Sequence, residues 1–308
     1  MSPAAEPYVV ENIRGAMQLM SDGTVRRAAD APAADAEHDG AVEWRDVTWH
    51  PGHDLNARIY RPRHLGAAND ARVPVVAGFH AWCLRLAGEL PAVVLSFDYR
   101  LAPEHRLPSP HEDGAAAMAW ARNEAARDPW LADAADFSRF FVAGDSAGGN
   151  IAHHVGVSFG RGIGPDLRLR GLVLLMPAMA GETRTRAELD GDRGGAFLTA
   201  EMSDRYARLL LPEGATRDHP LLNIAGPEAT GMEAAAMAPA IVVAAGRDIL
   251  RDRNAQYARR MKEEWGKEVE FVEFAGEEHC FFVVDPWSER ADELVRLVRK
   301  FVVEHMDS

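Results

Sequence analysis

The sequence contains few cysteines and little positive charge, and both shortages exclude functions. Its 308 residues include only two cysteines, Cys83 and Cys280, which lie far apart and form no C-x-x-C motif. A disulfide framework or a zinc site is therefore not expected, and we predict neither a metal nor a cofactor. The formal net charge of -13 disfavours nucleic acid and anionic membranes as partners, and it suits a neutral small-molecule substrate.

Long apolar runs are also missing. The N-terminus has no basic region followed by an apolar run, and no apolar stretch reaches the length needed to span a membrane. We therefore expect a cytoplasmic protein. The hydrophobic content of 47% is ample for a sizeable core, in one large α/β domain or in two modest ones.

What the sequence has instead is an alternation of apolar, strand-like runs with helical stretches. Two alternating runs, 42–50 and 55–61, flank Pro51-Gly52-His53-Asp54 and predict an antiparallel hairpin. Further strands are predicted at 73–79, 92–97, 139–143, 171–176, 240–245 and 269–274. Helices are predicted at 80–89, 112–126, 151–159, 252–265 and 289–303. This alternation predicts a mostly parallel sheet covered by helices on both faces.

Two segments fall outside the alternation. The first apolar residues recur at helical spacing and predict an amphipathic helix over 8–20: Val9, Val10, Ile13, Met17 and Met20. The long gap between the strands ending at 176 and beginning at 240 predicts an inserted cap, about 178–238, with a helix at 199–211. We therefore expect an N-terminal helix and linker, 1–40, followed by one α/β domain, 41–308.

A G-x-S-x-G motif lies about halfway along the chain, in Gly144-Asp145-Ser146-Ala147-Gly148. An apolar strand precedes it and a helix follows it, which is the context of a nucleophile elbow. The glycines let the backbone bend sharply and let a substrate approach Ser146. The turn also places the N–H of Ala147 at a helix N-terminus, where it can face a developing oxyanion.

A nucleophilic serine needs a base, and the base needs a carboxylate. Asp248 follows the predicted strand 240–245, and His279 follows 269–274, so both fall on the sheet edge that carries Ser146. Each residue also has a structural interpretation. Asp248 could cap the next helix, where Asp252 is a rival acid, and His279 could be a surface histidine among acidic neighbours. The joint order and placement favour a triad of Ser146, His279 and Asp248.

Other polar residues have weaker functional interpretations. His153 and His154 are adjacent on a predicted helix, so they point to different faces and cannot form a paired ligand set. His50 and His53 flank a hairpin turn and are not expected to bind metal. The charged residues of 98–106 are predicted to be structural ties in the loop after a central strand.

Two strings, Asp98-Tyr99-Arg100-Leu101-Ala102-Pro103-Glu104-His105 and Gly144-Asp145-Ser146-Ala147-Gly148-Gly149-Asn150, resemble the hormone-sensitive-lipase group of α/β-hydrolases. The segments 21–25 and 81–87 are similar to those of plant carboxylesterases, whose close relatives are the gibberellin receptors. The resemblance covers nearly the whole chain. It implies an α/β-hydrolase fold and an esterase of small or medium acyl esters that uses Ser146, Asp248 and His279. It also implies an N-terminal segment that folds back as a lid over the site.

One departure from that family affects the expected activity. The family carries a His-Gly-Gly-Gly-type loop after the strand that corresponds to 73–79, and its N–H groups complete the oxyanion hole. Here the strand runs directly into His80, which we assign to the following helix, so the glycine loop is interpreted as deleted. Gly78, Ala147 and Asp145 remain as the expected oxyanion and substrate-binding residues. Losing an oxyanion donor typically lowers turnover by about 10²–10³. A natural deletion and a misassembled coding sequence are equally compatible with these residues.

Three functions stay open at this point. The first is a serine carboxylesterase with weakened activity. The second is a non-catalytic receptor of a gibberellin-like hormone or an inactive hydrolase homologue; the missing glycine loop favours this reading. The resemblance implies that the receptors replace the triad histidine with an aliphatic residue, so His279 favours the enzyme. The third is a lyase that acts on a carboxylic ester with the same histidine as its base. The physiological ester and the oligomeric state are not readable from the sequence.

Overall fold

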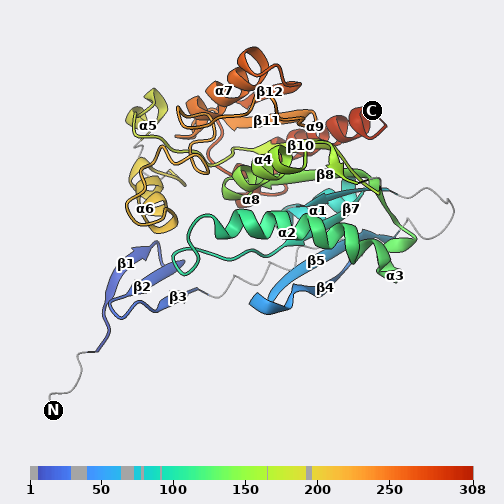
Figure 1. The fold of residues 1–308 in the computed structure, drawn as a ribbon, viewed down its shortest axis with the longest axis horizontal. Helices are drawn as coiled ribbons and strands as arrows, with labels where there is room; N and C mark the ends of the chain where they lie inside the picture. The colour runs from blue at the N-terminus through green and yellow to red at the C-terminus, as the bar shows by residue number, and fades with distance from the viewer. Residues whose placement is uncertain are drawn as a thin grey trace.

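The computed structural model describes residues 6–28, 40–63, 73–77, 80–90, 92–164, 166–191 and 196–307. Within these ranges the largest element is a nine-stranded sheet (Figure 1). In sheet order its strands are β12 (Val269–Phe274), β11 (Ala240–Ala245), β10 (Leu167–Leu175), β8 (Ala135–Asp145), β6 (Val73–Ala77), β7 (Val93–Phe97), β5 (Leu55–Pro62) and β4 (Val42–His50), with β9 (Gly162–Ile163) beside β10. Neighbours from β12 to β7 are parallel, while β5 and β4 are antiparallel. The predicted mostly parallel sheet is confirmed.

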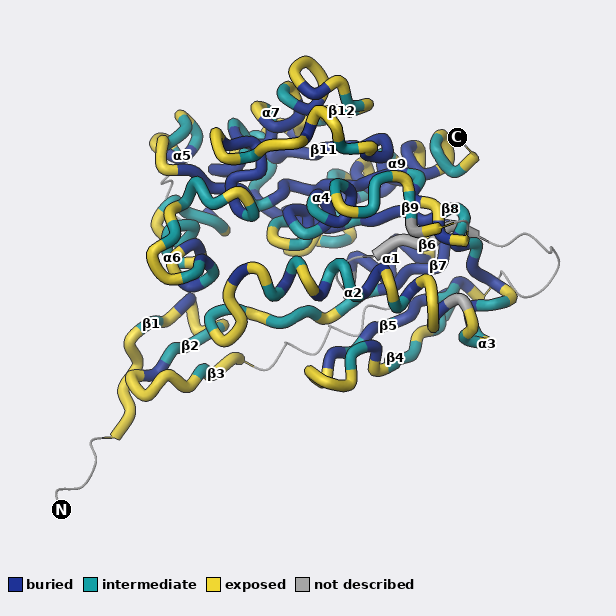
Figure 2. The backbone as a smooth tube through the Cα atoms, in the orientation of Figure 1, coloured by how far each residue is buried: buried dark blue, intermediate teal, exposed yellow. Residues whose placement is uncertain are grey.

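Helices cover both faces of this sheet because side chains alternate along each strand. On β10, Leu174 packs into a core cluster with α2, α4 and α7, whereas its neighbour Val173 packs with α1, α8 and α9. These helices are α2 (Ser109–Asn123), α4 (Ala147–Phe159) and α7 (Arg251–Arg259) on one face, and α1 (His80–Glu89), α8 (Phe281–Val284) and α9 (Glu289–His305) on the other. Figure 2 shows the buried strands between partly exposed helices. The sheet therefore lies between two apolar cores, one on each face.

The N-terminal prediction is wrong. Residues 8–20 form no helix; β1 (Val9–Ile13), β2 (Met17–Met20) and β3 (Val25–Arg27) make a separate antiparallel sheet. A tight turn after Ile13 causes this, since Arg14 and Gly15 have φ values of 47° and 77°, and such left-handed turns match the twist of a hairpin. Ile13 and Met17 then face each other across the turn, so the apolar spacing that suggests a helix also fits two paired strands.

The chain between β10 and β11 carries two helices, α5 (Arg186–Asp190) and α6 (Ala200–Leu210), the second close to the predicted 199–211. We call this part, 176–191 and 196–239, the cap segment. Figure 1 shows α6 beside the N-terminal sheet, and Arg208 of α6 donates a hydrogen bond of 2.6 Å to Glu11 of β1. The division of the chain at residue 40 and the limits 178–238 for the cap stay predictions.

The remaining helices are short. α3 (Pro129–Ala132) precedes β8, and the predicted helix 252–265 is divided into α7 and a π-helical turn, Arg260–Glu264. Among the described helices, none combines the length and the apolar character that crossing a bilayer requires.

Candidate active site

The register of the parallel strands brings four strand ends to one edge of the sheet. Leu175, the last residue of β10, pairs with Asp145 at the end of β8 and with Val243 of β11. Ala245 at the end of β11 pairs with Phe274 at the end of β12. The residues that follow these ends must therefore lie at the same carboxyl edge, where open α/β sheets bind ligands.

Ser146 occupies a sharp turn between β8 and α4. Its φ and ψ of 49° and -118° are strained for a residue with a side chain. The turn requires Gly144, because a Cβ there would lie 2.2 Å from the carbonyl oxygen of Gly148. The Ser146 N–H donates to the Leu175 carbonyl at 2.9 Å, which anchors the turn to β10. Ala147 opens α4, so its N–H has no acceptor within the helix.

Three predicted residues, Ser146, His279 and Asp248, meet in a chain of hydrogen bonds. Nδ1 of His279 lies 2.6 Å from Oδ2 of Asp248, and Nε2 of His279 lies 2.9 Å from Oγ of Ser146. A carboxylate only accepts, so Nδ1–H donates to Asp248 and Nε2 is left to accept from the serine hydroxyl. This is the arrangement in which a serine can be deprotonated by an imidazole whose tautomer is held by a carboxylate.

The structure also bears on the two structural interpretations, a surface position for His279 and a helix-capping role for Asp248. Only 3% of His279 is exposed, which excludes a surface histidine. Asp248 uses its second oxygen, Oδ1, to accept the Leu250 N–H at 3.0 Å, so it both fixes the start of the next helix and faces His279. The rival acid Asp252 instead accepts the Ala187 N–H at 2.8 Å and shows no bond to the histidine.

A second buried carboxylate, Asp145, lies immediately before the serine. Burial raises the pKa of Asp145 to about 6, against the opposing effects of the His279 charge and of hydrogen bonds from Cys280 and the backbone. The Cys280 thiol donates to Oδ2 of Asp145 at 3.6 Å. Asp145, which precedes the candidate nucleophile, thus contacts Cys280, which follows the candidate base. Burial raises the pKa of the Cys280 thiol and keeps it protonated.

Phe197 of the cap segment was missed by sequence reasoning. Its ring lies over the imidazole of His279, with the ring centroids 6.2 Å apart and the planes at 24°. Phe197 follows no strand and belongs to no motif or periodic pattern, so the sequence carries no signal for this contact. It places an aromatic group of the cap directly at the candidate base.

Other predicted residues fall outside the candidate triad. Gly78, expected near the oxyanion, lies outside the described residues, while α1 begins at His80 as predicted. Arg100 binds Asp113 through its backbone N–H and its guanidinium, consistent with a structural tie after β7. Within the described ranges, no group of three or more histidine, cysteine or acidic side chains is placed to hold a metal ion.

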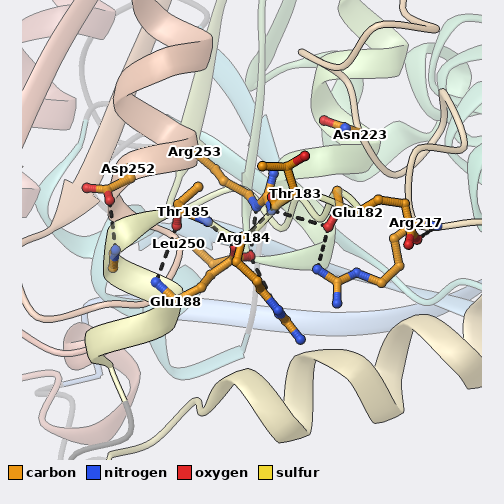
Figure 3. A network of polar contacts seen from close by, with 12 residues as sticks. Glu182, Thr183, Arg184, Thr185, Glu188, Arg217, Asn223, Leu250, Asp252 and Arg253 are labelled. Carbon is orange, nitrogen blue, oxygen red and sulfur yellow. Dashed lines mark hydrogen bonds and ion pairs between the residues drawn. The ribbon is translucent and has the colours of Figure 1, made fainter.

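The cap segment is joined to the sheet edge by a buried ion pair, which Figure 3 shows in its surroundings. Arg253 of α7 contacts both carboxylate oxygens of Glu188 in α5, at 2.8 and 2.9 Å. Burial raises the pKa of Glu188, but hydrogen bonds from Arg253 and Thr185 and the charges of Arg253 and Arg184 outweigh burial and hold it below its usual value. This pair fixes α5 beside the loop that carries Asp248.

Known proteins are similar to this chain in both sequence and fold. The family of the alpha/beta hydrolase fold matches residues 70–283. A probable carboxylesterase of Arabidopsis thaliana is 32% identical over 80% of this chain and 78% of its own length. A gibberellin receptor of the same plant is 34% identical over 71% of this chain and 69% of its own. The crystal structure of EstE1, a thermostable carboxylesterase from a metagenomic library, has a TM-score of 0.71 at 28% identity, covering 86% of this chain and 89% of that one.

Proposed function

The chain belongs to the alpha/beta hydrolase fold family, and from that premise we propose that it is a serine carboxylesterase of small or medium acyl esters. The observation that carries the proposal is the pair of hydrogen bonds from Asp248 through His279 to Ser146. We further expect the enzyme to act in the cytoplasm on a small-molecule ester, without a metal or cofactor, as the sequence predicts.

In the proposed reaction Ser146 is the nucleophile. Its Oγ bonds to the ester carbonyl carbon while the hydroxyl proton passes to Nε2 of His279, and Asp248 stabilises the imidazolium that results. The carbon–oxygen bond to the alcohol then breaks, and Nε2 returns the proton to the departing alcohol oxygen. Water then bonds to the acyl carbon while His279 takes one of its protons, the bond from that carbon to Oγ of Ser146 breaks as Nε2 returns the proton to Oγ, and the carboxylic acid is released.

The oxyanion side of the site is proposed to be weak. The Ala147 N–H at the start of α4 is one donor for the tetrahedral intermediate. The glycine loop that would supply further donors is interpreted from the sequence as deleted at Gly78-Phe79. Each missing donor is expected to lower turnover by about 10²–10³, so the proposed enzyme is slower than members that keep the loop.

A receptor is the second candidate, because the chain is similar to a gibberellin receptor. A receptor needs no proton path from its serine, whereas this chain keeps a histidine bonded to both Ser146 and Asp248. That path favours the enzyme.

Hydrolysis of short-chain nitrophenyl esters tests the proposal. We expect slow, saturable turnover that disappears in the Ser146→Ala variant, which removes the nucleophile but leaves the turn intact. Turnover equal to that of loop-containing carboxylesterases would refute the impairment, and turnover that survives in Ser146→Ala would refute the catalytic role of the serine.

A further inference from the structure

The tip of the N-terminal hairpin is hydrogen-bonded to the cap segment beside the candidate base, His279. Arg14, in the turn between β1 and β2, donates from Nη1 to the carbonyl of Phe197 at 3.0 Å and from Nη2 to the carbonyl of Ala196 at 2.9 Å. A planar guanidinium that holds two successive carbonyls fixes both the position and the direction of the backbone between them. The N-terminal sheet therefore holds the backbone that carries Phe197.

Phe197 is placed to contact a ligand as well as the protein. Its ring stacks over His279, yet 48% of the residue is exposed, in contrast to 3% of the histidine beneath it. Large aromatic side chains favour burial, and an exposed one beside a reactive group offers apolar area and a ring face to a bound molecule.

The proposed reaction indicates which part of a bound ester would lie beside Phe197. The acyl carbon is bonded to Ser146, whereas the alcohol oxygen must come within hydrogen-bonding distance of Nε2 of His279 to receive its proton. In the proposed reaction the alcohol group therefore lies beside the imidazole, on which the Phe197 ring is stacked.

We propose that Phe197 is a specificity-determining residue that selects esters of aromatic or bulky apolar alcohols, and that Arg14 is the positioning residue that holds it in place. This inference rests on the proposed esterase activity. It assigns the N-terminal sheet a part in choosing the alcohol group, through the two carbonyls that Arg14 binds.

The test compares kcat/KM for benzyl butyrate and ethyl butyrate, which share an acyl group, and for ethyl acetate, which shares the alcohol of the second. Phe197→Ala is expected to lower the benzyl-to-ethyl ratio about tenfold, a usual effect of removing an apolar contact from a pocket. Arg14→Ala is expected to lower it about threefold, and Arg14→Lys, which can hold one carbonyl, by less. The butyrate-to-acetate ratio is expected to stay constant.

Arg26→Ala is the matched control, since Arg26 is an exposed arginine of the same small sheet; its ratios should equal those of the wild type. An equal loss on all three esters in Phe197→Ala would show that the ring only supports His279, and an unchanged benzyl-to-ethyl ratio would show that it does not touch the alcohol. Either result overturns the inference while esterase activity persists. Absence of hydrolysis of every ester by the wild type would instead overturn the proposed function, and this inference with it.

Discussion

The two sides of the candidate site are packed to different extents. The sheet edge that carries Ser146, Asp248 and His279 is continuous with two apolar cores, and strand β11 is buried along its entire length. The N-terminal sheet across the site is mostly exposed, as Figure 2 shows, and polar side chains join it to the rest of the molecule. The candidate triad is thus more deeply packed than the N-terminal sheet across from it.

Charge pairs contribute to the attachment of the N-terminal sheet. Glu11 accepts from Arg208 at 2.6 Å, and Arg27 binds Glu104 at 2.5 Å from partly exposed positions. Exposed pairs of this kind contribute about 0–1 kcal/mol each and weaken as salt is added. Ile13 and Met20 are also buried, and burying a large apolar side chain contributes about 1.5–3 kcal/mol. Fewer buried side chains therefore hold the N-terminal sheet than hold the sheet edge.

The strongest test of the sheet edge compares substitutions of two neighbouring acids, Asp248 and Asp252. Asp248→Asn is expected to lower kcat by about 10⁴, because an amide no longer holds Nδ1–H of His279 and the imidazole loses the required tautomer. Asp252→Asn is the matched control, since that carboxylate accepts from Ala187 and has no bond to the histidine. Steady-state ester hydrolysis measures both; equal losses in the two variants would contradict the assignment of Asp248.

Breaking the buried ion pair between the cap segment and α7 is expected to have the largest effect on stability. Glu188→Gln leaves Arg253 with an uncompensated buried charge, which typically costs about 3–5 kcal/mol in the free energy of unfolding. Asp190→Asn breaks an exposed pair with Arg186 on the same helix and should cost less than about 1 kcal/mol. Denaturant unfolding compares them. Similar losses would mean that burial does not distinguish these pairs.

Asp145 predicts a pH dependence of stability. Burial raises its pKa to about 6 in the folded protein, whereas the unfolded chain ionises near the ordinary value of 3.8. The stabilising contribution of the protonated carboxyl is therefore complete below pH 3.8 and is lost as the pH rises to about 6. The wild type should lose about 2–3 kcal/mol over this range relative to Asp145→Asn, which cannot ionise. Parallel stability curves for the two proteins between pH 4 and 7 would contradict the burial of a titrating carboxyl.

The smallest expected effect concerns the attachment of the N-terminal sheet. Glu11→Gln weakens its pairing with Arg208 and Arg205, so the free energy of unfolding should fall by less than about 1 kcal/mol at low salt. The difference from the wild type should shrink further as salt screens the pair. Thermal unfolding at low and high sodium chloride measures this, and a salt-independent loss would indicate that packing rather than charge holds the sheet.

Much of the hydrolase core could be predicted from the sequence. The strands at 240–245 and 269–274 agree with β11 and β12 because their runs of β-forming residues are bounded by turn residues. The proximity of Asp248 and His279 to Ser146 follows from the same source, since each is a few residues beyond a parallel strand. Local patterns suffice here because the carboxyl ends of parallel strands share one edge of the sheet, so residues that follow different strands come together.

The N-terminal side of the candidate site could not be predicted in this way. A helix over 8–20 fits the apolar spacing, but the left-handed turn at Arg14 and Gly15 converts the same residues into paired strands. The contact of Arg14 with Phe197 joins positions 183 residues apart through a backbone carbonyl, which any residue could supply. Such contacts depend on how the completed elements pack, and no local sequence pattern encodes them.

Labelling with a fluorophosphonate tests the central claim most directly, because the reagent bonds only to a serine whose proton can be removed. Peptide mapping of the wild type should place the adduct on Ser146, and His279→Ala should abolish it while the protein stays folded. An unlabelled Ser146 in the wild type, or equal labelling without His279, would contradict the account.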